Sequence, residues 1–280
     1  MCEFCAKHGD GKKWYLQASN YGEELLDDLR RKRMIEHFFN EWMRPGPKSA
    51  LAGLTQLERA PRWLRGFIGG MATRKMKREH FGQVVPLEEA EEILKIATAV
   101  VRVPCVCRRL TVKRDEAYCL GISVNPNRFI GEDLTDPSFL SGPDAAGLQR
   151  LSPAEAIELM REFEKESLCH TIWTFVTPFI GGMCNCDRSD CLALTYTLQS
   201  SVKVVFRAEY VAAVDRGLCV GCRSCMRRCQ FGAIGFSAAD KKCVIDQRAC
   251  YGCGTCRSAC SKEAIRLQDR QAVPVAANLW

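Results

Sequence analysis

The sequence predicts an α+β protein with a mainly helical N-terminal domain, a small mixed α/β region that contains cysteines, and a separate cysteine-rich domain near the C-terminus. Apolar residues at helical spacing between residues 20 and 43 predict the first part. Short β-branched runs between capped helical segments predict the second part. Two cysteine runs that repeat each other predict the third. We expect domains at residues 1–85, 86–209 and 210–270, followed by a tail at 271–280.

The composition favours a cytoplasmic protein whose thiols bind metal. The 280 residues are 47% hydrophobic, which is ample for a buried core, and they include 18 cysteines. The N-terminal stretch MCEFCAKHGDGKKWYLQ lacks the apolar segment of a secretory signal, and no run approaches the roughly eighteen apolar residues that cross a bilayer. Cysteines two and three positions apart are too crowded for ordinary disulfides, so a reducing compartment with metal-bound thiolates is the better interpretation.

The segment at residues 20–43 predicts one long helix. Tyr21 and Leu25 begin an apolar series at helical spacing, and acidic side chains precede basic ones, as the helix dipole favours. Pro45 and Pro47 close the segment.

A basic segment follows at residues 59–78, where arginine and lysine alternate with Trp63, Phe67 and Met71. Two interpretations remain open. The segment docks on a protein, a membrane surface or nucleic acid, or it is a solvated helix face whose apolar side packs inward.

In the middle of the chain, the β-branched run VVRVPCVC predicts a strand that leads into Cys105 and Cys107. Residues 125–151 are rich in Pro, Gly, Asp and Ser and predict a long loop. A helix then begins with Ser152 as N-cap and Glu155 three positions later, a capping-box pattern. Another strand is expected at residues 202–214, next to the last domain.

The C-terminal repeat carries the most specific pattern. Both halves read C-x2-C-x2-C-x3-C, which is a ligand spacing of iron–sulfur proteins. Zinc ribbons pair C-x2-C units across a longer gap and need no third and fourth cysteine at these offsets. An offset of 31 residues relates four cysteine pairs: Cys219 and Cys250, Cys222 and Cys253, Cys225 and Cys256, and Cys229 and Cys260.

Small residues lie among these ligands. Gly221, Gly252 and Gly254 would let the backbone turn closely around a cube of iron and sulfide. The fourth cysteine of each run is expected to lie one turn into the following helix.

The last 60 residues or so resemble the bacterial two-cluster ferredoxins, a family of electron carriers. The resemblance implies a ferredoxin-like 2[4Fe-4S] domain in which the fourth cysteine of each run binds the other cluster. The family has proline after that cysteine, whereas this chain has Gln230 and Ser261. The implied ligands are Cys219, Cys222, Cys225 and Cys260 for one cluster, and Cys250, Cys253, Cys256 and Cys229 for the other.

Further cysteines lie upstream of the repeat. Two C-x-C pairs would each point both thiols to one face of a strand, and Cys191 is expected at the start of a helix, whose dipole favours a thiolate. A third iron–sulfur cluster is the preferred interpretation and a zinc site is the alternative. The candidate ligands are Cys105, Cys107, Cys119, Cys184, Cys186 and Cys191.

Six further residues have no firm assignment. Cys169 is interpreted as a buried, inert thiol. Asp187 and Asp190 are interpreted as solvated turn residues. At the N-terminus, Cys2, Cys5 and His8 could complete a metal site or do nothing.

The chain from VPCVCRR through CNCDRSDCLA and into the repeat resembles uncharacterised cytoplasmic 4Fe-4S-binding proteins of anaerobic bacteria and archaea. This resemblance covers most of the chain. It implies electron transfer in general terms and supplies no substrate.

Three functions follow from these features. The preferred one is an iron–sulfur electron carrier or subunit that passes single electrons to a partner oxidoreductase. The net charge of +7 suggests that the partner has an acidic surface, met by the arginine-rich loop around Met226. The alternatives are a redox enzyme whose upstream cysteine site binds a substrate, and a redox-responsive nucleic-acid binder, which the sequence favours least. No nicotinamide, flavin or phosphate-loop fingerprint is visible.

Overall fold

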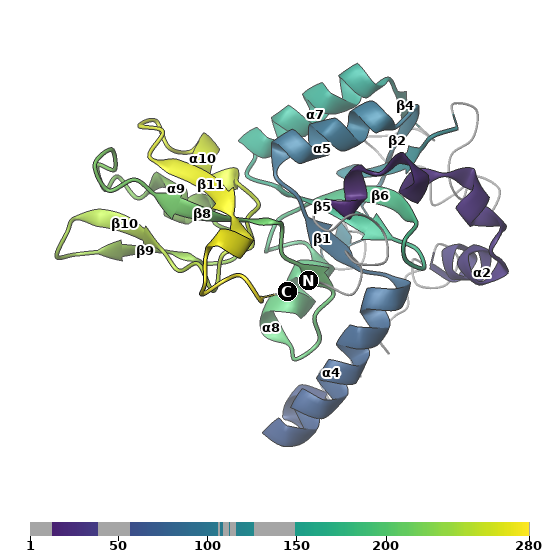
Figure 1. The fold of residues 1–280 in the computed structure, drawn as a ribbon, viewed down its shortest axis with the longest axis horizontal. Helices are drawn as coiled ribbons and strands as arrows, with labels where there is room; N and C mark the ends of the chain where they lie inside the picture. The colour runs from purple at the N-terminus through teal and green to yellow at the C-terminus, as the bar shows by residue number, and fades with distance from the viewer. Residues whose placement is uncertain are drawn as a thin grey trace.

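The computed structural model describes residues 13–38, 57–105, 107–108, 112, 116–125 and 149–279. Its larger part is built around a sheet of seven strands (Figure 1). They are β1 (Gly82–Val84), β2 (Ala99–Val103), β3 (Cys119–Ser123), β4 (Gln149–Leu151), β5 (Cys169–Thr174), β6 (Ile180–Cys186) and β7 (Val205–Phe206). The strand order is β4-β2-β3-β6-β5-β1-β7. All neighbours are antiparallel except β1 and β7, which are parallel.

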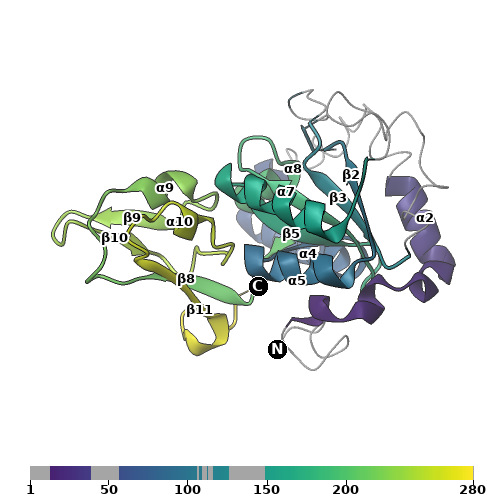
Figure 2. The same ribbon diagram turned by 90° about the horizontal axis from the view of Figure 1, so that it is seen from above.

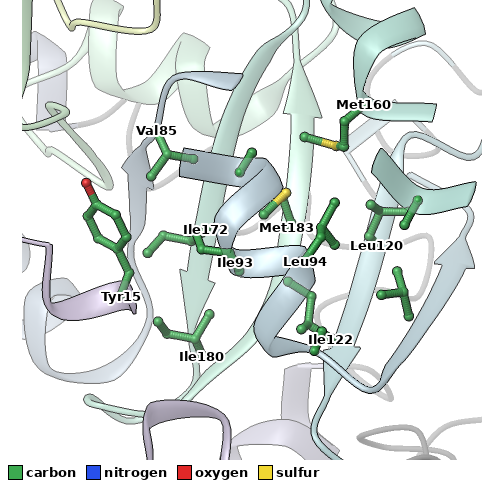
Figure 3. Packing of buried hydrophobic residues seen from close by; sticks show 14 of the residues in the cluster. Tyr15, Val85, Ile93, Leu94, Leu120, Ile122, Met160, Ile172, Ile180 and Met183 are labelled. Carbon is green, nitrogen blue, oxygen red and sulfur yellow. The ribbon is translucent and has the colours of Figure 1, made fainter. Parts of the chain in front are cut away.

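Two helices, α5 (Leu87–Ile96) and α7 (Pro153–Lys165), lie side by side over one face of this sheet (Figures 1 and 2). Their apolar sides meet strand residues such as Ile172 and Met183 in the main hydrophobic core (Figure 3). The predicted capping box of α7 is confirmed, because Ser152 and Glu155 each accept a backbone N–H from the other. This core fixes the sheet on which the upstream cysteines lie.

The opposite face of the sheet packs against α4 (Arg62–Glu79) and α8 (Leu192–Gln199). Because strand side chains alternate between faces, Trp173 and Cys186 lie in this second cluster, while their neighbours Ile172 and Met183 lie in the first. The second cluster therefore contains thiols as well as aliphatic side chains.

The basic segment forms α4, and its inward side is contributed by Ala72 and Met76. Trp63, Phe67 and Met71 are instead 74%, 65% and 56% exposed. The interpretation in which the apolar side chains of this segment pack inward is therefore wrong for these three residues. No helix within the described ranges is both long and apolar enough to cross a membrane.

The single helix expected at residues 20–43 is wrong for the residues that the structure describes. Three short 3-10 helices, Trp14–Leu16, Ala18–Tyr21 and Glu23–Asp27, precede α2 (Leu29–His37). Asp28 starts α2, because its carboxylate accepts the N–H groups of Arg30 and Arg31. Residues 39–43 lie outside the described ranges.

The N-terminal segment shares its core with the sheet. Trp14, Tyr15 and Tyr21 are buried in the main hydrophobic core, and β1, which precedes the boundary expected at residue 85, pairs with β5. The described part of the N-terminal region and the cysteine-containing region are thus built on one sheet.

The C-terminal cysteine repeat folds into a small module beside the sheet, at one end of the molecule (Figure 2). It contains β8 (Tyr210–Val214), α9 (Ser224–Arg228), β9 (Ile234–Ser237), β10 (Lys242–Ile245), α10 (Thr255–Ser258) and β11 (Ile265–Asp269). β8 pairs with β11 and β9 pairs with β10, so each pair joins one strand from each half of the repeat. The strand expected at residues 202–214 is divided into β7 and β8, since Ala208 N–H donates to Tyr251 O between them.

Candidate metal centres

One pocket of the module brings together cysteines from both halves of the repeat. Its lining includes Cys219, Cys222 and Cys225 from the first half and Cys260 from the second. Cys219 and Cys225 are buried, Cys260 is half-buried and Cys222 is exposed. With Cys243, five cysteines line this pocket, and four thiols are the donor set that a [4Fe-4S] cluster takes in proteins.

The second group of repeat cysteines lies deeper. Cys250, Cys253 and Cys256 are buried and Cys229 is half-buried. The other three thiols lie within electrostatic reach of Cys256, and burial together with these neighbours raises its pKa. Burial also raises the pKa of Cys250 to about 11. Cys250 and Cys256 are therefore neutral thiols without metal, and metal binding would release their protons.

Backbone N–H groups donate to sulfur at equivalent positions of the two halves. Ala233 N lies 3.3 Å from Cys229 Sγ, and Ala264 N lies 3.3 Å from Cys260 Sγ. Such N–H···S contacts stabilise the charge of cluster ligands. The residues present thus fit an iron–sulfur cluster in donor type, placement and hydrogen bonding.

Two glycines allow the cysteine loops to lie close to neighbouring segments of the backbone. Gly221 and Gly252 have φ angles of +70° and +76°, and a Cβ on either would lie 2.1 Å from the carbonyl oxygen of Lys241 or Tyr210. The close approach that requires glycine here is to backbone oxygens of adjacent segments. The expected approach of the backbone to cluster sulfur stays a prediction.

The six upstream candidates form a closed ring of side-chain contacts. Around the ring, Cys105 contacts Cys107 and Cys119, Cys191 contacts Cys107 and Cys186, and Cys184 contacts Cys119 and Cys186. We call these six residues the thiol ring.

Several separate elements contribute to the thiol ring. Cys119 on β3 faces Cys184 on β6 in the sheet register, and their Sγ atoms are 3.5 Å apart. Cys184 and Cys186 share one face of β6, and Cys191 is the N-cap of α8, as expected. The other C-x-C pair is not on a strand, because β2 ends at Val103.

Asn185 is held on the opposite face of β6 from its two cysteine neighbours. Its Oδ1 lies 2.7 Å from His170 Nδ1, and its Nδ2 donates to Tyr118 O at 2.8 Å. These contacts fix the strand orientation that turns Cys184 and Cys186 toward the ring.

A buried arginine lies beside the thiol ring. Arg108 has 4% of its side chain exposed and pairs with Glu116, Asp187 and Asp190. The interpretation of Asp187 and Asp190 as solvated turn residues is therefore wrong, since both orient Arg108. Cys105 lies within electrostatic reach of the guanidinium.

Cys169 connects the thiol ring to the module. It is fully buried on β5, directly opposite Cys186 of the ring in the sheet register. Its thiol also interacts with that of Cys253, and this interaction lowers the pKa of Cys253 to about 7. Sequence reasoning missed this role, because nothing in the spacing of Cys169 relates it to either group.

Basic and polar residues of the module contact the larger part of the protein. Arg257 pairs with Glu88 at 2.7 Å, and Arg228 donates to Lys165 O. Gln230, which replaces the family's proline, donates to Ser167 O at 2.8 Å and accepts from Arg188 N at 2.9 Å. These side chains join parts of one chain, so only part of the arginine-rich loop remains exposed for a partner.

No three histidine, cysteine or acidic side chains in the described ranges are arranged to hold a single metal ion. The thiols of the repeat and the upstream thiols lie in a pocket and in a ring, respectively. Cys243 is buried, lines the pocket and contacts Cys225. Cys2, Cys5 and His8 lie outside the described residues.

Comparison with known families supports this chemistry. Residues 212–235 match the model of the 4Fe-4S binding domain. They cover the first cysteine run of the repeat. A search of curated proteins finds no match. The chain therefore carries a domain with an iron–sulfur, electron-transferring role.

Proposed function

Taking the 4Fe-4S binding domain at residues 212–235 as the premise, we propose that the module binds two [4Fe-4S] clusters in a ferredoxin-like arrangement and passes single electrons to a partner oxidoreductase. The observation that carries this proposal is the pocket lined by Cys219, Cys222, Cys225 and Cys260. It contains cysteines from both halves of the repeat. Bound clusters supply reversible one-electron chemistry.

The strand pairing supports cross-ligation. Because β8 pairs with β11 and β9 with β10, the chain of each half returns beside the other half. Cys260 is thereby brought to the first three cysteines, and Cys229 lies in electrostatic reach of Cys256. The second half of the repeat, which the family match does not cover, supplies equivalent residues at the same 31-residue offset.

The two sites differ in their access to solvent. At the first, Cys222 is exposed, and Leu218 and Val220 are 52% and 61% exposed nearby in sequence. At the second, three of four thiols are buried and Cys253 contacts the sheet through Cys169. The first site is therefore the proposed point of contact with a partner.

Exposed positive charge flanks this point of contact. Arg227 is exposed and lies in electrostatic reach of Cys222, and Lys262 is exposed and lines the pocket. We assign the partner an acidic docking surface, because opposite charges accelerate encounter between proteins. The sixteen described cysteines are all free thiols, which suits a cytoplasmic location.

The cluster assignment is tested by substituting one ligand from each half. In anaerobically purified protein, Cys222→Ser and Cys253→Ser should each change the electron paramagnetic resonance spectrum of the reduced module in a different component. Arg74→Ala, a substitution of an exposed residue on α4 outside the module, serves as the control and should keep both components. Two variants with spectra like that of the wild type would contradict the assignment.

The docking assignment is tested with reduced flavodoxin, an acidic one-electron protein carrier. The Arg227→Glu, Lys262→Glu double variant should slow electron transfer at low salt by about tenfold, since steering depends on charge near the contact. Arg74→Glu on α4 removes an exposed positive charge elsewhere and should leave the rate unchanged. If both variants slowed electron transfer equally, the contact with the partner would not lie at Arg227 and Lys262.

A further inference from the structure

We propose that the thiol ring is the ligand set of a third iron–sulfur cluster, joined to the module through Cys169. The ring gathers six cysteines from β3, β6, the N-cap of α8 and the chain that follows β2. This inference rests on the proposed function in one respect: the electrons that reach the third cluster would come from the clusters of the module.

The number and arrangement of thiols favour a cluster of several metal atoms. A structural zinc ion takes four ligands around one point, whereas the ring presents six thiols in sequence around its circumference. A [4Fe-4S] cluster would be bound by four of the six thiols, and the other two thiols would not bind iron.

Burial and charge of the site suit thiolate ligands. Cys105, Cys186 and Cys191 are buried, and the other three ring members are half-buried. Several thiolates in such a place need nearby positive charge. Arg108 supplies it in reach of Cys105 and Cys186. Asp187 and Asp190 hold the guanidinium in place, so its position does not depend on the ring itself.

The placement of Cys169 connects the ring to the second site of the module. Cys169 faces Cys186 across the pair β5 and β6 and contacts Cys253 on its other side. Cys169, Cys186, Cys191 and Cys253 belong to one hydrophobic cluster, so protein atoms fill the space between the two ligand sets. A cluster at the Cys253 site would give up one electron, and the cluster in the thiol ring would gain it, with no bond made or broken.

The test begins with the metal and sulfide content of the full chain purified without oxygen. About twelve irons with a matching amount of acid-labile sulfide are expected for three clusters, and about eight for the module alone. About eight irons would overturn the inference, whether the ring then held zinc or no metal. Absence of iron altogether would overturn the proposed function as well.

A triple variant assigns the additional iron to the ring. Cys107→Ala, Cys119→Ala and Cys184→Ala replace the half-buried members and leave three ring thiols, too few for a four-thiolate cluster. Two substitutions would not suffice, because four thiols would remain. The variant should lose about four irons while the module's resonance spectrum is retained.

Cys169→Ala is the control, because it removes a fully buried thiol that is not a ring member. It should keep about twelve irons. Full iron content in the triple variant would overturn the assignment of the ring. Should the triple variant fail to fold, the iron, sulfide and zinc content of the wild-type chain decides by itself.

Discussion

The thiol of Cys169, on the central sheet, interacts with that of Cys253, a proposed cluster ligand of the module. The contact joins two parts of the chain that differ in sequence pattern and in cysteine spacing. It also lowers the pKa of Cys253 to about 7, because the neighbouring thiol stabilises the thiolate. The same donor would stabilise the more negative, reduced form of a cluster bound at Cys253.

Cys169→Ala should therefore lower the reduction potential of the cluster at Cys253. One hydrogen bond of about 1 kcal/mol corresponds to about 40 mV for one electron. A potentiometric titration followed by electron paramagnetic resonance measures the shift. Cys169→Ser keeps a donor and should stay closer to the wild-type potential. A higher potential in the alanine variant would contradict the role of the hydrogen bond.

Gln230→Ala should weaken the attachment of the module to the larger part of the protein. The substitution removes the contacts with Ser167 O and Arg188 N. We expect a loss of about 2 kcal/mol in the free energy of unfolding, measured with urea. Ser261→Ala is the control, because Ser261 occupies the equivalent position of the second half and is exposed. Equal losses in both variants would show that the contacts of Gln230 contribute nothing.

Gly221→Ala should strongly destabilise the module. The φ angle of +70° and the 2.1 Å approach of a Cβ to Lys241 O leave no room for a side chain. We expect a loss of about 3 kcal/mol or more. Gly235→Ala is the matched control within the module, since its Cβ would meet only Val244 at 3.6 Å. Thermal unfolding and iron content measure both, and an unchanged Gly221→Ala variant would refute the packing described here.

His80 should make the protein less stable in acid. Burial lowers its pKa to about 4, against 6.5 for an unperturbed histidine, although the ring also contacts Thr174 O at 2.6 Å. Because the unfolded chain binds the proton first, the stabilising contribution is complete above pH 6.5 and is lost progressively as the pH falls toward 4. The full loss is about 3 kcal/mol.

Urea unfolding at several pH values measures this effect. His80→Gln keeps a polar side chain that cannot titrate, and its stability should decline less than that of the wild type between pH 6.5 and 4. Parallel pH curves for the two proteins would contradict the assignment to His80.

Local sequence patterns predicted the elements whose stabilising contacts are local. The capping box of Ser152 and Glu155 lies within four residues, and Cys184 and Cys186 share a strand face because side chains alternate. The same logic failed at residues 20–43, where the Asp28 cap outweighed the apolar period.

The remaining features depend on contacts between distant segments, which spacing cannot reveal. The thiol ring closes through the register of Cys119 with Cys184, which are 65 residues apart. Arg108 pairs with Asp187, which is 79 residues away in the sequence. The role of Gln230 depends on which surface the module packs against. In the sequence, this residue is visible only as a departure from a family pattern.

The central claim is that the cysteine repeat holds two clusters that carry single electrons. The most direct measurement is a redox titration of the anaerobically purified chain, followed by electron paramagnetic resonance. We expect reversible one-electron reductions with magnetic interaction between two [4Fe-4S] clusters held by the module, one of which loses its signal in Cys222→Ser. A chain without reducible clusters, or with a signal unaffected by substitution of the repeat cysteines, would contradict it.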